Sequence, residues 1–423
     1  MNVKPIVASL VALGVSSSIA FAGQAVTAPD HVDAMKAKIA RLEAVLDQNQ
    51  GQAYSFAQLP LAGWQDRVTV SGMVNADAWV SGNTPALGNK FANVDTSSSM
   101  GVSGALFVDA EVNCWTTAHV ALNYFSDNGR ISDMPRINDN LNATGNGINL
   151  DEAYITVSNF AKSPVYARVG RQYVDFGNYY RYPITASFTQ LLSQTRATAL
   201  TVGFNDASGF QASAYLFRGI PELANANRTR LNNGGVNLSY RGAASGVHYM
   251  VDAGWINSMA DVSTINATVG TSYTTDKVGG LSLHGDIMYA NMDASVDYVT
   301  ALRNFNSADL TTSGGDARPH ALAIDAGYSF ASAGLPSRVG AGYNRSWQAD
   351  GIGGVSSTAD SAQVWAGAMP RSRWYAQYGV EIGRNTDLTF QLVSDKNYNT
   401  PANGSASGRT STTGVLRLGV RFA

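Results

Sequence analysis

Apolar and polar residues alternate along most of the sequence from position 67 onward. In the final stretch, GVLRLGVRFA, Leu416 and Leu418 occupy one set of alternate positions, which we call the apolar parity. Arg417 and Arg421 occupy the other set, which we call the polar parity. The same alternation recurs in RVTVSGMVNADAWV, MGVSGALFVDAEVN, LSLHGDIMYA, RWYAQYGVEIG and LTFQLVSD. Because side chains of a β-strand point alternately to opposite faces, the pattern predicts strands with one apolar and one polar face.

Two features of these strands favour a closed transmembrane barrel over a soluble β-sandwich, which would also alternate. The runs reach about ten residues, longer than the strands of most soluble sheets, and Tyr and Trp flank the apolar parity as in membrane girdles. We predict an all-β transmembrane barrel over residues 66–423 with about 16 antiparallel strands. The count shifts by about two according to whether DSAQVWAGAMP is a strand or a folded loop. A closed sheet of this size surrounds an aqueous channel.

The N-terminus has the organisation of a secretory signal peptide. Lys4 supplies a positive charge, an apolar stretch covers Ile6–Ala20, and an A-x-A cleavage site ends at Ala22. A buried N-terminal helix is the alternative, but this order of features favours a signal peptide at residues 1–22. The sequence therefore predicts export.

Residues 23–65 are predicted to hold a linker and a short coiled-coil helix. The apolar seam of this helix has alternating spacings of three and four residues and consists of Val32, Met35, Ile39, Leu42 and Leu46. Roughly two heptads are too few for a stable isolated coil, so the pattern suggests a homotrimer held together by a larger domain. The alternative is a lone amphipathic helix that lies against the barrel or plugs it.

Composition agrees with this picture. Charged residues are 14% of the protein, against about 25% in average globular proteins. The 42 glycines and the single cysteine, Cys114, suit an exported barrel without disulfides, and the net charge of −2 argues against nucleic acid as a partner. Phe422, on the apolar parity, resembles the terminal signal that outer-membrane insertion machinery binds, although Ala423 is last. The predicted partners are this machinery and outer-membrane lipid, and the predicted location is the cell outer membrane.

The sequence contains no motif for catalysis, for a metal ion or for a cofactor. Its five histidines are scattered, and none lies in a metal-binding or nucleophile-elbow motif. His248 and His284 share the polar parity of their strands, so a metal pair and two polar lumen residues are both compatible with the pattern. We predict that the protein is not an enzyme and needs no cofactor.

Charged residues on the polar parity are the candidates for a channel lining. They are Asp109, Glu111, Asp252, Asp286, Glu381, Arg168, Arg373, Arg417 and Arg421. Acidic and basic rows on opposite walls would orient charged solutes. The same residues would also brace the wall, and the sequence does not separate the two roles.

A denser cluster lies in YARVGRQYVDFGNYYRYPITASFTQLLSQTRATALTVGF. It combines Arg168, Arg171, Arg181 and Arg196 with Tyr173. Arginine forks bind carboxylates and phosphates, and tyrosine adds an apolar ring with a hydroxyl. The cluster therefore suggests a constriction loop for an anionic, partly aromatic ligand. The alternative is a tyrosine-rich interfacial girdle with loop packing.

The segments GRQYVDFGNYYRYPITASFTQLLSQTRATALTVGF and RTSTTGVLRLGVRF resemble the LbtU-type siderophore porin family of Gram-negative bacteria. The short coil KIARLEAVLDQ before the barrel is also similar. The resemblance implies an outer-membrane barrel that takes up a ferric siderophore without a plug domain. It assigns no role to individual residues.

Three functional hypotheses follow. The first is a channel for uptake of small solutes, with a ferric siderophore as the implied substrate. The second is a general or anion-preferring diffusion porin, which differs in lacking a saturable site. The third is a structural or adhesive outer-membrane protein, in which the coil is a tether and the long loops are contact surfaces.

Overall fold

The computed structural model of the protein describes residues 67–82, 96–125, 147–177, 183–219, 222–223, 231–269, 273–352, 369–400 and 407–422. The predicted signal peptide (1–22), the predicted linker and coil (23–65) and Arg181 lie outside these residues.

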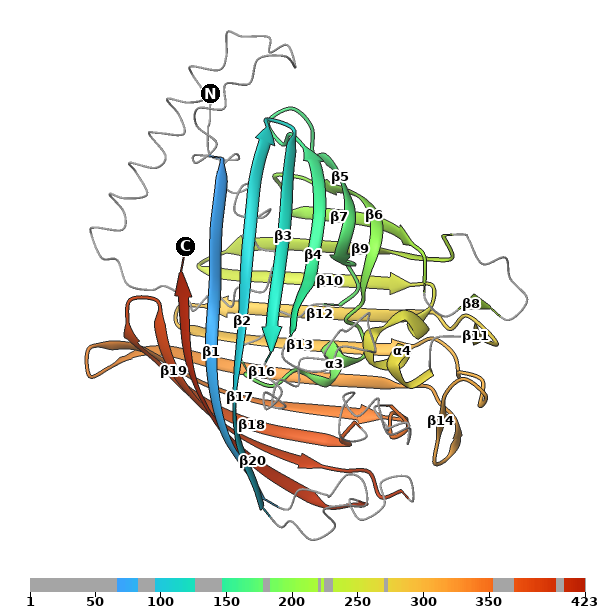
Figure 1. Ribbon diagram of the computed structural model, residues 1–423, viewed down its shortest axis with the longest axis vertical. Helices are drawn as coiled ribbons and strands as arrows, with labels where there is room; N and C mark the ends of the chain where they lie inside the picture. The colour runs from blue at the N-terminus through green and yellow to red at the C-terminus, as the bar shows by residue number, and fades with distance from the viewer. Residues whose placement is uncertain are drawn as a thin grey trace.

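Sixteen antiparallel strands form one closed barrel (Figure 1). They are β1 (Val68–Gly82), β2 (Thr96–Asn113), β3 (Thr116–Phe125), β4 (Gly147–Ser158), β5 (Val165–Tyr173), β6 (Arg196–Asn205), β7 (Phe210–Phe217), β9 (Asn233–Ala244), β10 (Val247–Ile256), β12 (Gly280–Tyr289), β13 (Met292–Ala301), β16 (His320–Ser332), β17 (Leu335–Trp347), β18 (Ser372–Gly383), β19 (Thr386–Lys396) and β20 (Thr410–Phe422). Strand β20 closes the ring by pairing with β1, and Gly72 lies opposite Phe422. The predicted barrel class, the strand number and the closing role of the C-terminal strand are confirmed.

The two ends of the barrel differ in the length of their connections. At one end, two-residue turns such as Ser245–Gly246 and Ala333–Gly334 join adjacent strands. Both residues of each turn have a positive φ, at 51° and 81° in the first and 51° and 78° in the second. This conformation matches the right-handed twist of a hairpin, and it explains glycine at the second position. We call this the short-turn end, and the opposite end, where connections such as 174–195 and 257–279 lie, the long-loop end.

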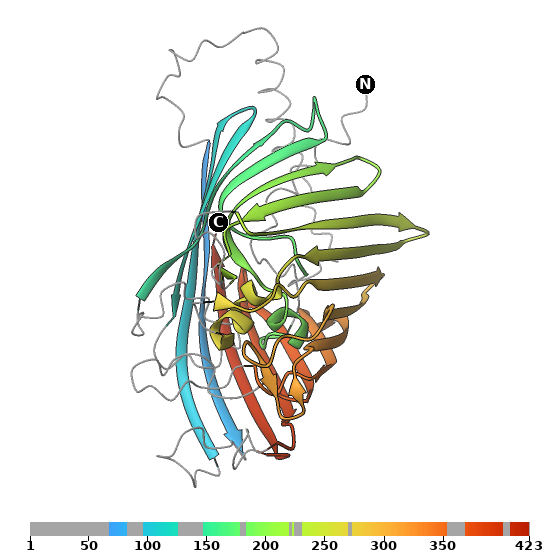
Figure 2. The same ribbon diagram turned by 90° about the vertical axis from the view of Figure 1, so that its right-hand side faces the viewer.

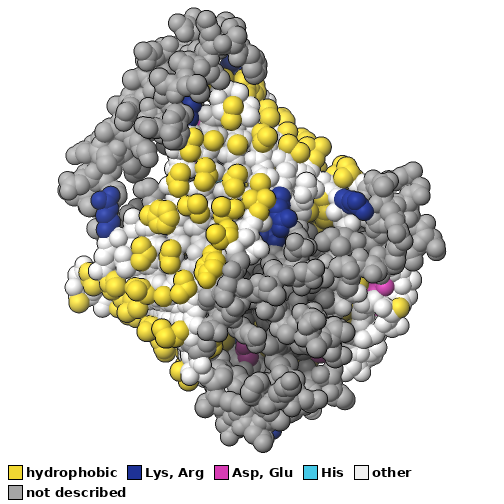
Figure 3. Space-filling view, in the orientation of Figure 1, with side chains coloured by type: hydrophobic (Ala, Val, Ile, Leu, Met, Phe, Trp, Pro, Cys, Tyr) yellow, Lys and Arg dark blue, Asp and Glu magenta, His cyan; other side chains and the backbone are white. Residues whose placement is uncertain are grey.

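The outer face of the barrel is apolar and its inner face is polar. Outward side chains such as Val251, Leu283 and Ile324 are exposed, and Figure 3 shows hydrophobic side chains spread over the visible strands. Their neighbours in sequence, such as Asp252 and His284, point into the lumen. The strand alternation seen in the sequence thus has the apolar face outside, the reverse of a soluble protein.

Outward-facing aromatic side chains gather in two bands. The band near the short-turn end contains Phe204, Phe210, Tyr240, Tyr249, Tyr289, Tyr328, Phe330, Tyr378 and Phe422. The band near the long-loop end contains Trp255, Tyr298, Tyr343, Trp347 and Trp374. Rings within a band touch across strands, as in the Tyr240–Tyr249 and Tyr343–Trp374 pairs, with centroids 6.1 and 4.3 Å apart.

Short elements outside the barrel strands belong to the long connections. Among the described residues they are α3 (Phe188–Leu191), the 3₁₀ turn η2 (Met259–Asp261), α4 (Ser263–Val269) and the two-residue strands β8 (Glu222–Leu223), β11 (Tyr273–Thr274), β14 (Thr311–Thr312) and β15 (Gly315–Asp316). Helices α3 and α4 lie within the ring of strands in both views (Figures 1 and 2). None of the helices among the described residues is long and apolar enough to cross a membrane.

Candidate functional site

The connection between β5 and β6, residues 174–195, folds into the lumen and reaches the opposite wall. We call it the inward segment. Its Thr185 exchanges hydrogen bonds with Gln391 of β19, through backbone N to Oε1 at 3.3 Å and Nε2 to Oγ1 at 3.1 Å. The Phe188 amide donates to Asn344 Oδ1 of β17 at 3.0 Å. Because β17 and β19 are far from β5 and β6 in the ring, the inward segment partitions the lumen.

Arg373 of β18 is the strongest anchor of this segment. Its guanidinium forms a two-point ion pair with Asp395, at 2.7 and 2.8 Å. The same guanidinium donates to the Ala186 carbonyl at 3.0 Å and lies 5.2 Å from the Phe188 ring centroid. The Ser187 hydroxyl caps α3 by accepting from the Gln190 amide at 3.1 Å. Arg373 therefore faces the lumen and also binds the inward segment to the wall.

A second connection, residues 257–279, packs against the inward segment. The Ser263 amide donates to the Gln194 carbonyl at 3.0 Å, and the Thr264 hydroxyl donates to the Leu191 carbonyl. Side chains of both connections and of the adjacent wall form one apolar core, whose members include Val174, Phe176, Phe188, Leu191, Leu192, Tyr215, Phe217, Ile256, Met259, Val262 and Ile265. A water-filled barrel of this width has no such core, so these connections narrow the lumen and give it a fixed shape.

Ion pairs between strands lie along the described inner wall, three of them between neighbouring strands and one across an intervening strand. They are Arg338 with Asp293, Arg373 with Asp395, Arg417 with Asp77, and Arg421 with Asp387. The pair between Arg417 and Asp77 is a two-point contact at 2.6 and 2.9 Å that joins β20 to β1 across the closing seam. Arg338 reaches Asp293 across Gly327, where an added Cβ would collide with the guanidinium. Glycine at that position leaves room for the pair.

The structure divides the predicted arginine cluster between the two faces of the wall. Arg168 is on the lumen side and buried, with its guanidinium 5.0 Å from the Tyr154 ring and 3.4 Å from Gln172 Oε1. Arg171, Tyr173 and Arg196 occupy the outward parity of β5 and β6. They therefore do not meet Arg168 in a lumen constriction, and β5 and β6, rather than the connecting loop, carry them.

The outward members of the cluster surround Asp151. A register shift between β3 and β4 leaves Asp151 outside the ladder, and such a bulge re-aims a side chain. Its carboxylate pairs with Arg196 and accepts from the Tyr173 hydroxyl at 3.0 Å, while Arg171 donates to its carbonyl at 3.2 Å. The sequence signal for this bulge is a change of apolar parity within β4, from Ile148 and Leu150 before Asp151 to Ile155 and Val157 after it, because one extra residue moves the following side chains to the other face.

The predicted acidic lining residues do face the lumen. Asp109 Oδ1 accepts a hydrogen bond of 2.6 Å from His119 Nδ1. Glu111 lies at the short-turn end of β2, and Glu381 lies opposite Asp387 on β18 and β19. Lumen parity alone identified these residues. The anchors Asn344 and Gln391 were missed, although they also lie on the polar parity, because no local pattern tells an anchor from a lining residue.

The two histidines on the polar parity of β10 and β12 do not form a pair. Residue His248 lies opposite Met288, whereas His284 lies opposite Asp252 and contacts Asp297 at 2.7 Å through Nδ1. Within the described ranges, no three potential metal-ligating side chains come together.

One connection at the long-loop end is fixed by a buried tyrosine. Tyr398, which follows β19, forms a hydrogen bond of 2.8 Å with the Ser346 hydroxyl. Burial raises the pKa of the Tyr398 hydroxyl to about 12, so the group stays neutral at physiological pH.

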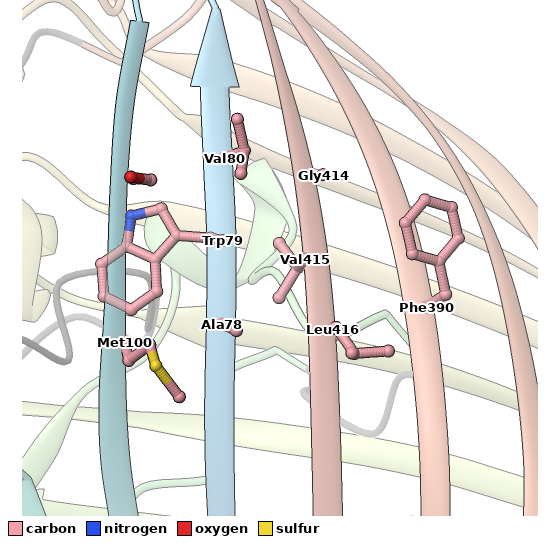
Figure 4. A pocket seen from close by; sticks show the side chains of 9 residues that line it. Ala78, Trp79, Val80, Met100, Phe390, Gly414, Val415 and Leu416 are labelled. Atoms are coloured by element: carbon pink, nitrogen blue, oxygen red, sulfur yellow. The ribbon is translucent and has the colours of Figure 1, made fainter.

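A depression of about 480 Å³ lies on β1, β2, β19 and β20 (Figure 4). Its lining is mostly outward-facing and apolar, and includes Val80, Met100, Phe390 and Leu416. Gly414 lies between Val80 and Phe390 and contributes no side chain, which accounts for the hollow. It is a feature of the outer face and is separate from the lumen.

No family model matches the protein. The protein is 27% identical over 360 residues to the "UPF0422 protein" of Coxiella burnetii, an alignment that covers 84% of this protein and 69% of that one. It is 26% identical to a "UPF0422 protein" of Legionella pneumophila strain Paris, with 78% of this protein and 62% of that one covered. The protein thus spans somewhat less than two thirds of the length of the Legionella relative.

Solved structures with a similar fold are porins. OprB of Pseudomonas putida has a TM-score of 0.55 at 11% identity, covering 85% of this protein and 95% of that one. OmpF of Salmonella typhi, in complex with daunomycin, has a TM-score of 0.53 at 12% identity, covering 84% and 97%. An anion-selective porin from Comamonas acidovorans has a TM-score of 0.50 at 11% identity, covering 84% and 99%. The protein has a porin-like channel fold.

Proposed function

We propose that the protein is a diffusion channel of the outer membrane, through which small solutes cross. One observation carries the proposal: the barrel is apolar outside and charged inside, with a connection folded across its lumen. An apolar exterior is stable only against lipid, whereas a charged interior requires water. An inward-folded connection restricts passage by size and charge, as the lining of a selective pore does.

The outer aromatic bands support membrane insertion. Aromatic rings toward both ends of an apolar exterior are typical of the girdles that flank the apolar band of outer-membrane barrels. Export through residues 1–22 and self-association through residues 23–65 remain parts of this proposal.

The experiment is ion conductance of the purified full-length protein in a planar lipid bilayer. Stepwise, ohmic conductance increments are expected as single barrels insert. A correctly folded protein that inserts without conducting would contradict the proposal and favour the structural or adhesive hypothesis.

Uptake of a ferric siderophore is the narrower form of the proposal and rests on sequence resemblance. Saturable block of the conductance by a ferric siderophore at low concentration would support it. Unblocked conductance would leave a general diffusion porin.

A further inference from the structure

The basic side chains of the lumen wall are largely neutralised. Arg338, Arg373, Arg417 and Arg421 each pair with an aspartate of another strand. A charge pair of this kind has no net charge, so it attracts cations and anions about equally from a distance. These arginines therefore brace the wall and add little positive potential to the lumen.

Several lumen carboxylates have no such partner. In the described residues, neither Asp252 of β10 nor Asp286 of β12 forms an ion pair, and each has a buried Oδ1 without a hydrogen-bond partner. The positive charge of Arg241 on β9 interacts electrostatically with both carboxylates. Its Nε lies 3.0 Å from Met250 Sδ. One guanidinium faces two carboxylates on this wall, so the wall is acidic.

The excess of carboxylates over guanidiniums extends around the described wall. Besides its ion pairs, the wall carries the carboxylates Glu111, Glu152, Asp252, Asp286 and Glu381, and the guanidiniums Arg168 and Arg241. The charge of Arg168 interacts first with Asp175 of the inward segment and also with Glu152, and Arg241 is the other guanidinium in this set. Glu111 and Glu381 lie toward the short-turn end of the barrel.

We infer that the channel prefers cations to anions, and that its natural solutes are small cations, including amines. The inference rests on the proposed channel function and names its solute class. A low-dielectric wall concentrates the field of its charges into the lumen, which raises the local concentration of counter-ions. The inference is opposite in sign to the anionic ligand that the arginine cluster suggested, because Arg171 and Arg196 lie on the outward parity.

The test is the reversal potential of the full-length protein in a planar bilayer of neutral lipid under a KCl gradient. Neutral lipid removes the surface charge of the membrane from the measurement. We expect potassium to be favoured over chloride by about threefold or more. A ratio at or below one would overturn the inference while leaving the channel function intact, whereas absence of conductance would contradict the channel function itself.

Variants then assign the preference to the carboxylates. The double variant Asp252→Asn, Asp286→Asn is expected to lower the potassium-to-chloride ratio at least about twofold. Glu111→Gln changes an exposed carboxylate on the polar parity of β2, so it carries little risk to folding and is expected to lower the ratio less. Asp206→Asn is the matched control. It removes the same charge from the turn between β6 and β7, and its amide still accepts from the Ser208 backbone N–H.

The control is expected to keep the ratio of the parent protein. An unchanged ratio in both lumen variants, or an equal fall in Asp206→Asn, would overturn the inference.

Discussion

At the scale of single residues, the lumen wall is held by arginine–aspartate pairs. The pair of Arg417 with Asp77 matters most for closure, because it joins the last strand to the first. Both side chains are largely shielded from water, with 17% and 8% of their surfaces exposed. A shielded carboxylate is costly once its partner is removed.

We expect Arg417→Leu to destabilise the barrel by about 3 kcal/mol, because Asp77 would keep its charge without a partner. The measurement is the urea midpoint of unfolding from lipid vesicles, followed by tryptophan fluorescence. The double variant Arg417→Leu, Asp77→Leu is the control and should be more stable than the single one. If the two variants unfold at the same midpoint, the pair does not stabilise the seam.

At the scale of elements, the inward segment is a folded unit held by polar contacts from several strands. Asn344, Arg373 and Gln391 come from β17, β18 and β19 and bind its backbone or side chains. Three anchors on rigid strands fix a connection that would otherwise be free to move. The described part of the inward segment therefore has a fixed position in the lumen.

Replacing Arg373 by alanine should loosen this segment, since the hydrogen bond to the Ala186 carbonyl and the contact with the Phe188 ring are both lost. Amide hydrogen exchange in residues 188–192 is expected to become about tenfold faster, as loss of one charged hydrogen bond implies. Larger open-channel current noise should accompany it.

Arg421→Ala is the matched control for that experiment. It also removes a wall arginine paired with an aspartate, but at the short-turn end, away from the segment. Equal exchange rates in Arg373→Ala and the parent protein would show that Arg373 does not anchor the segment.

At the scale of the whole molecule, the strands carry apolar side chains outside and polar side chains inside, the reverse of a soluble protein. The described core lies inside the lumen, between the inward connections and the wall, while a second apolar surface covers the outside. Lipid takes the place of a second layer of protein against that surface.

Val251→Arg should therefore impair folding into lipid by about 2–4 kcal/mol, because Val251 faces outward between the aromatic bands. His248→Arg, on the same strand but facing the lumen, should be tolerated. The measurement is the folded fraction in lipid vesicles as a function of urea. Equal tolerance of the two variants would contradict the assignment of the two faces.

The sequence by itself determined the barrel, its strand number, its closing strand and the lumen parity of residues such as Asp109, Glu111, Arg373 and Glu381. These features follow from the alternation of apolar and polar residues along each strand, which can be read from neighbouring positions in the sequence. Only the tertiary structure decided which charges are neutralised, because the partner of Arg417 is Asp77, at the other end of the barrel sequence. It likewise decided that Arg171, Tyr173 and Arg196 lie on the outward parity around the bulged Asp151, and that residues 174–195 cross the lumen to β17 and β19. Contacts between distant strands depend on ring closure, and no local pattern of residues encodes them.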